Sequence, residues 1–222
     1  MGKIGIITIG QSPRDDIVPE IRAILGREHA IVEAGAIDGY TIKDVKDQEV
    51  LPCDDILVSR MRDGTEVKVT KRFVVPLIQN RISEMEDEGI EVILVLCTGK
   101  FPEFRSNTLI VTPSKFIRGV VEGSIRKGRL GVIYPAQEQT AKAQDEWGKE
   151  NLNVYADVAS PYGSDEEIER LADRLSGEDL DLILLNCMGF SGRMKRLIFE
   201  RTKKPVIQAN ALVARVLKEL II

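Results

Sequence analysis

The sequence predicts an α/β protein with a parallel sheet in each half of the chain. Apolar runs at residues 92–96 (VILVL) and 182–185 (LILL) suit strands buried on both faces, which is typical of parallel sheets covered by helices. Residues 128–134 (GRLGVIY) also repeat the scheme of residues 2–8 (GKIGIIT), so that Gly131 stands in the place of Gly5. We therefore expect a degenerate internal duplication with two similar α/β halves.

The first half opens with a strand, a helix and a second strand. Residues 3–9 form a short apolar strand, and Ser12 followed by Pro13 is typical of an N-cap and a first helical position. Apolar residues then recur at helical spacing up to Gly26, and residues 30–36 form the next strand. This β-α-β pattern implies a right-handed crossover and a parallel sheet.

An insertion interrupts the first half at about residues 37–71. Two β-prone runs, residues 56–60 and 65–69, flank Met61-Arg62-Asp63-Gly64, and Asp-Gly between such runs is typical of a hairpin. Helical periodicity resumes at residues 73–87 and leads into the first apolar run. The sequence therefore predicts a small antiparallel β-hairpin inserted into a parallel α/β domain.

The second half follows the same scheme without the insertion. A strand at residues 107–112 completes the first half, and a helix opened by Pro113 leads to the repeated strand at residues 128–134. A strand at 153–158, a helix from Ser164 and the second apolar run follow, and residues 205–222 supply a last strand and helix. We expect this tail to close back onto the first half, which gives a first domain of residues 1–112 and 205–222 and a second domain of residues 113–204.

Composition excludes several classes of function. The formal net charge of -4 leaves no basic surplus for phosphates, so we expect no nucleic-acid partner. No apolar run approaches the roughly 18 residues of a membrane helix and no leader pattern precedes the first strand, so we expect no membrane partner and a cytoplasmic protein. The three cysteines lack C-x-x-C spacing, so we expect no metal, and Cys53 in a polar turn is interpreted as a bystander.

The single histidine limits the mechanisms that are available. His29 falls between the first helix and the second strand, where we expect a surface residue. A Ser-His-Asp or Cys-His arrangement would have to be built on His29 alone. The chemistry is therefore expected to use Cys, Asp, Glu, Arg, Lys or Tyr.

Two cysteines stand at the positions where chemistry is expected. Cys97 and Cys187 each follow an apolar strand, and ligands of open α/β sheets bind at the carboxyl ends of the strands. A helix that begins after such a cysteine favours the thiolate and offers N–H groups to a carboxylate. If the strand ends of the two halves face each other across a cleft, one thiolate can remove a proton from a carbon acid and the other thiol can return one to the opposite face, without a cofactor. The alternative is that both cysteines are small buried hydrophobes.

The ordered motifs of the whole chain resemble the AroM family. They are ITIGQSPR at residues 7–14, NCMGF at residues 186–190 and ANALVAR at residues 209–215. That family in turn resembles the aspartate/glutamate and hydantoin racemase superfamily. The resemblance implies two pseudo-symmetric flavodoxin-like parallel-sheet domains with the site in the cleft between them.

The resemblance also implies roles for particular residues. Cys97 and Cys187 match the two acid/base thiols of the racemases, Thr98 matches a hydroxyl that helps to hold the substrate carboxylate, and the loop Gly10-Gln11-Ser12 matches a substrate-binding loop. The racemases typically continue their cysteines as Cys-Asn-Thr and Cys-Thr-His. Here the corresponding sequences are Cys97-Thr98-Gly99 and Cys187-Met188-Gly189.

Several polar residues are further candidates. Arg14 is interpreted either as a grip for a substrate carboxylate or as a solvated arginine, and Gln11 with its counterpart Gln137 could supply paired amide hydrogen bonds. Tyr40 and Tyr162 follow corresponding strands and are expected near the mouth of the cleft. The sequence thus assigns catalysis to Cys97 and Cys187, and substrate binding to Gly10, Gln11, Ser12, Arg14, Thr98, Gly99, Gln137, Met188 and Gly189.

These residues predict a racemase-like isomerase that needs no cofactor. Its expected partner is a small carboxylate, such as an amino acid, a hydantoin or a related carbon acid, and a homodimer remains open. Two alternatives also fit the sequence: a one-thiol decarboxylase or cis-trans isomerase of the same superfamily, and a non-catalytic protein that binds small anions.

Overall fold

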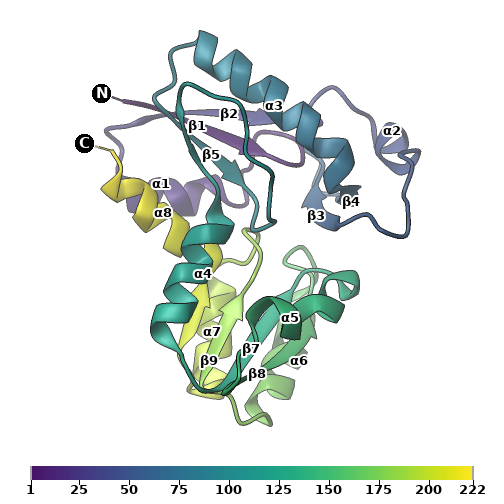
Figure 1. Ribbon diagram of the computed structural model, residues 1–222, viewed down its shortest axis with the longest axis vertical. Helices are drawn as coiled ribbons and strands as arrows, with labels where there is room; N and C mark the ends of the chain where they lie inside the picture. The colour runs from purple at the N-terminus through teal and green to yellow at the C-terminus, as the bar shows by residue number, and fades with distance from the viewer. Residues whose placement is uncertain (1, 222) are drawn as a thin grey trace. The chain divides into compact units, whose positions relative to one another are not determined.

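The computed structural model describes residues 2–221, and the chain folds into two compact units (Figure 1). The first unit runs up to Ser114 and includes the residues from Ala214 onward, and the second unit is Lys115–Val213. Each unit is built on a four-stranded parallel sheet. The predicted α/β class with two parallel sheets is confirmed.

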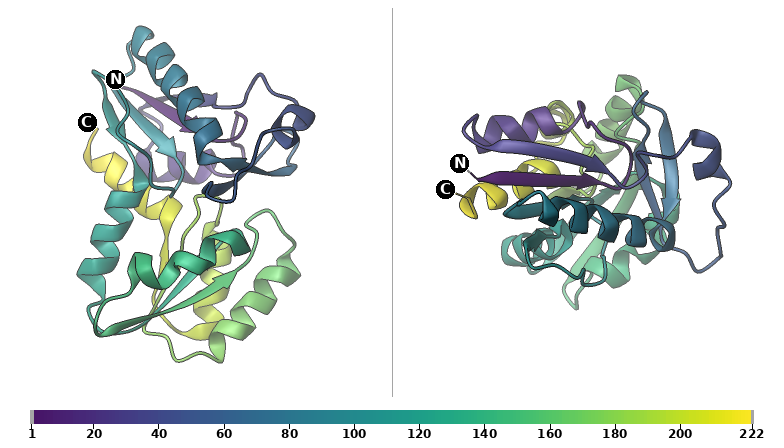
Figure 2. Two further views of the ribbon diagram at one scale, coloured as in Figure 1. Left: turned by 45° about the vertical axis from the view of Figure 1, so that its right-hand side comes forward. Right: turned by 90° about the horizontal axis from the view of Figure 1, so that it is seen from above.

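The sheet of the first unit has the strand order β2-β1-β5-β6. The strands are β1 (Lys3–Thr8), β2 (Ala30–Gly35), β5 (Val92–Leu96) and β6 (Leu109–Val111). Helix α3 (Lys71–Asp87) lies along one face of this sheet and α1 (Val18–Leu25) along the other (Figures 1 and 2). The helices cover both faces, which explains why β5 is buried at every residue.

The inserted hairpin has the predicted strands. Strands β3 (Ile56–Arg60) and β4 (Glu66–Thr70) pair antiparallel, with Arg60 opposite Glu66. The insertion also holds a short helix, α2 (Ile42–Lys46), that the sequence did not predict; its N-cap Thr41 and Asp44 form a capping box. Leu57, Val67 and Val69 are buried in the core of the first unit, so the hairpin is part of that core.

The second unit repeats the order of the first sheet, as β8-β7-β9-β10. Its strands are β7 (Gly128–Tyr134), β8 (Leu152–Val158), β9 (Leu182–Leu185) and β10 (Val206–Gln208). Its helical segments are α4 (Pro113–Ser124), which begins in the first unit, η1 (Gln137–Lys142), α5 (Ala143–Trp147), α6 (Asp165–Ser176) and α7 (Gly192–Thr202). Gly5 pairs with Ile93 in the first sheet and Gly131 with Ile183 in the second, so corresponding residues occupy corresponding registers.

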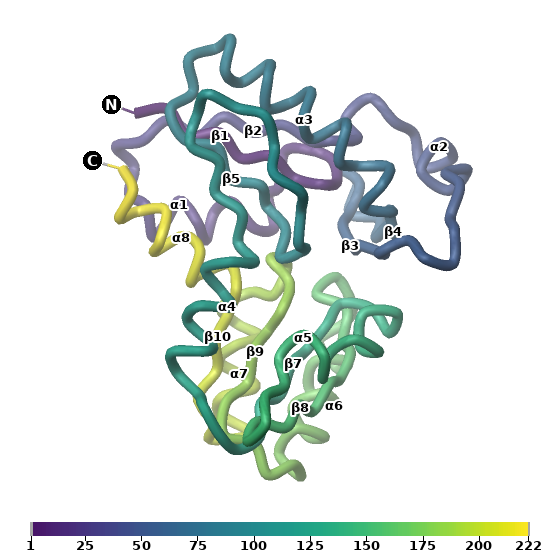
Figure 3. Tube along the Cα trace, viewed as in Figure 1, coloured from purple at the N-terminus to yellow at the C-terminus, as the bar shows by residue number. Residues whose placement is uncertain are grey.

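The tail of the chain differs from the expectation. Residues 205–222 were expected to belong wholly to the first domain, but β10 pairs with β9 and extends the second sheet (Figure 3). Val206 and Gln208 are buried there, which holds the strand in place. The chain returns to the first unit only at Ala214, inside α8 (Ala209–Glu219).

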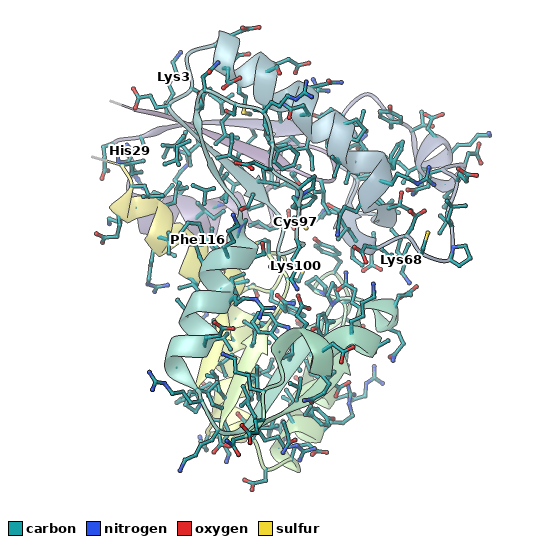
Figure 4. The ribbon with its side chains drawn as sticks, in the orientation of Figure 1. Lys3, His29, Lys68, Cys97, Lys100 and Phe116 are labelled. Carbon is teal, nitrogen blue, oxygen red and sulfur yellow. The ribbon has the colours of Figure 1, made fainter. Side chains whose placement is uncertain are left out.

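Two local predictions near the N-terminus are wrong. The first helix begins at Val18 with Ile17 as its N-cap, rather than at Pro13 after a Ser12 cap. The carbonyl of Arg14 accepts the N–H groups of Ile17 and Val18, so a turn precedes the helix. His29 (labelled in Figure 4) is buried, with 6% of its surface exposed, and its Nδ1 has no hydrogen-bond partner among residues 2–221.

We expect Gly5→Ala to destabilise the first unit. A Cβ at this position would meet Met85 of α3 at 2.5 Å and Ile90 and Ile93 at 3.1 and 3.2 Å, and overpacking of this kind costs about 1 to 3 kcal/mol. Gly119→Ala is the matched control. It lies in α4 with nothing within 4 Å of the new Cβ, so we expect a gain of about 0.5 to 1 kcal/mol. Urea unfolding measures the change in the free energy of unfolding of each variant. Equal changes in the two variants would contradict the packing argument.

Within residues 2–221, no helix is both long and apolar enough to cross a bilayer.

Candidate active site

The first cysteine lies at the carboxyl edge of the first sheet. Thr8 pairs with Leu96, so the loop after β1 and Cys97 leave adjacent strands at the same edge. Figure 4 shows Cys97 at the end of β5, with Lys100 farther along the same loop. Only 9% of Cys97 is exposed, and the N–H of Gly99 donates to its Sγ at 3.4 Å. An N–H directed at sulfur stabilises negative charge there.

Gly99 lies in a narrow space beside this thiol. A Cβ at residue 99 would lie 3.1 Å from Leu57 of the hairpin, 3.4 Å from the Cys97 sulfur and 3.5 Å from Phe101. Thr98 is partly exposed between the two. Glycine therefore allows the backbone to approach Cys97 closely, and the inserted hairpin forms one side of the thiol's surroundings.

The loop after β1 is fixed to the hairpin and to the loop after β2. The Gln11 N–H donates to the carbonyl of Arg60 at 3.1 Å, and Gln11 Oε1 accepts the N–H of Arg62 at 2.9 Å. Its Nε2 donates to the carbonyls of Ile37 and Tyr40 at 3.3 and 2.9 Å. The amide predicted to bind substrate thus also joins three segments of the first unit.

Ser12 is held by the side chain of Asp38, which was not among the predicted site residues. Asp38 accepts the N–H and the hydroxyl of Ser12, both at 2.7 Å, and also the N–H of Gly35 at 2.7 Å. Gly10 lies against the hairpin, because a Cβ there would collide with Ser59 Oγ and the Arg60 carbonyl. The position of Asp38, three residues after β2 ends, is the signal that could have identified it.

Arg14 forms an ion pair inside the first unit. Its side chain is 3% exposed, and its Nε and Nη2 donate to the two carboxylate oxygens of Asp16 at 2.8 and 2.7 Å. Its Nη1 donates to Thr8 Oγ1 at 2.9 Å. The guanidinium that we predicted to grip a substrate carboxylate thus holds a carboxylate of its own chain, and the solvated alternative does not apply.

The electrostatics of Asp16 follow from this pair. Burial raises the pKa of its carboxyl, but the hydrogen bond and charge of Arg14 and the charge of Arg60 outweigh burial and bring the pKa below its usual value. Arg60 lies at the end of β3, with its Nη1 3.7 Å from Asp16. The hairpin therefore contributes charge to the same edge as the loop after β1.

The second cysteine occupies the corresponding place in the second unit. Cys187 follows β9 by two residues and is 8% exposed, and the N–H of Asn186 donates to the carbonyl of Ile133 at 2.9 Å. Met188 is buried, with 3% exposed. A Cβ at Gly189 would lie 2.9 Å from Pro161 and 3.0 Å from the Tyr162 hydroxyl. Both cysteines thus stand two residues before a tightly packed glycine.

A buried tyrosine adjoins the loop that carries the second cysteine, and no sequence motif indicated it. Tyr134, the last residue of β7, accepts the indole N–H of Trp147 at 3.1 Å and donates to Glu146 at 3.3 Å. Burial, followed by the charge of Glu146, raises the pKa of Tyr134 above its usual range, so its hydroxyl stays protonated. Asn186 is the third hydrogen-bond partner of this hydroxyl.

We predicted that Gln11 and Gln137 are counterparts with paired amide hydrogen bonds, but the surroundings of the two side chains differ. Gln137 is exposed at the start of η1, and its Nε2 donates to Thr140 at 3.0 Å. Gln11 instead lies within a network of loops. Tyr40 packs edge-on against Phe73 with ring centroids 5.4 Å apart, and Tyr162 lies beside Gly189.

Each unit therefore presents a similar set of groups at the carboxyl edge of its sheet. A buried thiol follows the third strand of the sheet order, and a close-packed glycine follows the thiol. Such a cysteine can release a proton as the thiol and take one up as the thiolate. Within residues 2–221, no group of three or more His, Cys, Asp or Glu side chains could hold a metal ion.

Comparisons with known proteins give a family and a set of similar folds. A family model described as AroM protein matches residues 4–221. No curated protein matches the sequence. Among solved structures, glutamate racemase from Aquifex pyrophilus is 15% identical with a TM-score of 0.60, over 99% of this chain and 84% of that one.

Two further solved structures have the same fold. The Nocardia farcinica maleate cis-trans isomerase is 14% identical with a TM-score of 0.64, over 99% of this chain and 92% of that one. The Picrophilus torridus aspartate racemase is 18% identical with a TM-score of 0.55, over 99% of this chain and 94% of that one. At these identities the likeness concerns the fold.

Proposed function

The chain belongs to the AroM family, and on that premise we propose that it is a cofactor-independent, racemase-like isomerase that acts on a small carboxylate. Cys97 and Cys187 are the proposed acid/base pair. The substrate class comprises amino acids, hydantoins and related carbon acids.

One observation carries this proposal. The two sheets have the same strand order, and in each a buried cysteine follows the equivalent strand, β5 or β9. A single buried cysteine is ordinarily a small hydrophobe, but repetition of the thiol and its neighbouring glycine in both units favours a shared role. The solved structures of similar fold include racemases of glutamate and aspartate, which supports the reaction class.

The proposed reaction consists of two balanced proton transfers. The thiolate of one cysteine takes the proton from the carbon beside the carboxylate, which leaves a thiol and an enolate-like carbanion. The thiol of the other cysteine then gives its proton to the opposite face of that carbon and becomes a thiolate. The N–H of Gly99, which donates to Cys97 Sγ, is suited to stabilise the thiolate form of that cysteine before it takes the proton. This mechanism requires the two sulfurs to flank one substrate.

Incubation in deuterated water tests the proposal. Each enantiomer of candidate amino acids, hydantoins and hydroxy acids is supplied separately, and NMR spectroscopy follows loss of the α-proton while chiral chromatography follows inversion. We expect deuterium to enter the product at the inverted centre. Binding without exchange would instead support the anion-binding alternative. Loss of carbon dioxide or isomerisation of a double bond would support the one-thiol alternative, which the likeness to maleate isomerase keeps open.

A further inference from the structure

A pocket in the first unit lies between the inserted hairpin and the loops after β1 and β2. Its volume is about 450 Å³, and it is broadly open to solvent. Its polar lining consists of Gln11, Thr41, Arg62 and Asp63. All of these residues lie in one compact unit, so the pocket is formed by a single domain.

Arg62 supplies positive charge to this pocket. Its Nε donates to the carbonyl of Ser12 at 2.6 Å, which fixes the plane of the guanidinium. Among residues 2–221 its Nη atoms make no hydrogen bond, and Nη2 lies 3.6 Å from an oxygen of Asp38. That carboxylate already accepts three shorter hydrogen bonds. The fork of Arg62 therefore retains donors for a carboxylate ligand.

The other side of the pocket is apolar. Tyr40, Ile42 and Met61 line it, and all three pack against the core of the first unit. The edge-on contact with Phe73 holds the ring of Tyr40, and its hydroxyl makes no hydrogen bond among residues 2–221. A ligand that fits this lining has an apolar body and an anionic end.

Asp63 lies at the rim and carries the opposite charge. Its Oδ1 accepts the N–H of Thr65 at 2.9 Å, and this bond holds the carboxylate in the hairpin turn. Hydrogen bonds from Thr65 lower its pKa, so it is ionised at neutral pH. It would repel a carboxylate and attract an ammonium group, which provides a way to distinguish ligands.

We propose that this pocket binds a small carboxylate with an aryl or branched alkyl body, and that Arg62 pairs with the carboxylate. Gln11 links the pocket to the edge where Cys97 lies, because the loop after β1 and Cys97 leave paired strands. The ligand is a substrate only if the proposed isomerase activity holds. Binding in the pocket does not depend on turnover.

NMR titration of the isotope-labelled full-length protein tests the proposal with phenylacetate, phenylacetamide and phenylalanine. We expect phenylacetate to shift the resonances of residues 40–42 and 61–63, and phenylacetamide to bind at least about tenfold more weakly, because it lacks the charge. Arg62→Gln keeps the backbone N–H to Gln11 and should weaken phenylacetate binding by about tenfold or more. Lys68, labelled in Figure 4, lies on β4 of the same hairpin and does not line the pocket. Lys68→Gln therefore removes a positive charge from the hairpin and should leave binding unchanged.

Asp63→Asn should strengthen phenylacetate binding a few-fold and weaken that of phenylalanine, whose ammonium group loses a partner. Absence of binding, equal binding of acid and amide, or unchanged binding by Arg62→Gln would overturn the proposal. Urea unfolding of each variant identifies a loss of binding that is caused by a loss of structure. Binding that persists in a protein without isotope exchange would reject the isomerase and retain the pocket.

Discussion

Serine in place of Cys187 is expected to reduce inversion of the substrate by about 10²- to 10⁴-fold, because a hydroxyl cannot replace a thiol as a proton donor and acceptor near neutral pH. Cys97→Ser should have an effect of the same order. The rate of inversion is measured by chiral chromatography of the reaction mixture. Cys53→Ser is the matched control, since Cys53 is exposed, and it should leave the rate unchanged.

The two variants should also differ from each other in a specific way. With one thiol removed, the remaining thiol still faces the α-proton of a single enantiomer and can exchange it with solvent without inverting the centre. Cys97→Ser should therefore exchange one enantiomer and Cys187→Ser the other. Unchanged exchange of both enantiomers after Cys187→Ser would reject the two-thiol assignment.

Asp16→Asn is expected to lower the free energy of unfolding by about 3 kcal/mol, because it leaves the buried guanidinium of Arg14 without a counter-charge. An asparagine also turns an N–H₂ group toward the donors of Arg14. Urea unfolding at neutral pH measures the difference in the free energy of unfolding between the native protein and Asp16→Asn. Asp15→Asn is the control: Asp15 is the exposed neighbour, and its replacement should change stability by less than about 0.5 kcal/mol.

The same pair predicts a dependence on pH. Because folding lowers the pKa of Asp16, the pair stabilises fully above the usual aspartate pKa of about 3.9 and loses its contribution as the pH falls through the folded value. The difference between the native protein and Asp16→Asn should therefore narrow in acid. A difference that is constant with pH would mean that the charge of Asp16 does not support the fold.

The regular parts of the fold could be predicted because their signals are local. The apolar runs that become β5 and β9, the helical periodicity of α3 and the Asp63-Gly64 turn each depend on residues close together in the chain. The positions of Cys97 and Cys187 at strand ends followed directly from those runs. The structure places both as expected, with each at the carboxyl edge of its sheet.

The remaining features depend on partners distant in sequence. Ser12 is a residue type that commonly caps a helix, but its hydroxyl donates a hydrogen bond to Asp38, which is 26 residues away. The three-residue strand β10 carries no local sign of which sheet it joins. Arg14 and Asp16 are close in sequence, but only the burial of the side chain of Arg14 shows that they serve each other rather than a ligand. Tertiary contacts decide each of these cases.

The hairpin makes the surroundings of Cys97 and Cys187 chemically unequal. Leu57 and Arg62 belong to it, and within residues 115–213 the second unit has no two-stranded sheet of this kind. In the proposed reaction, one enantiomer would give its proton to the Cys97 thiol beside the hairpin. The other would give its proton to Cys187, whose loop packs against Tyr162 at Gly189. The equilibrium constant of a racemisation is one, so kcat/KM must be the same in both directions. The inequality must therefore appear as compensating differences in kcat and KM between the two enantiomers.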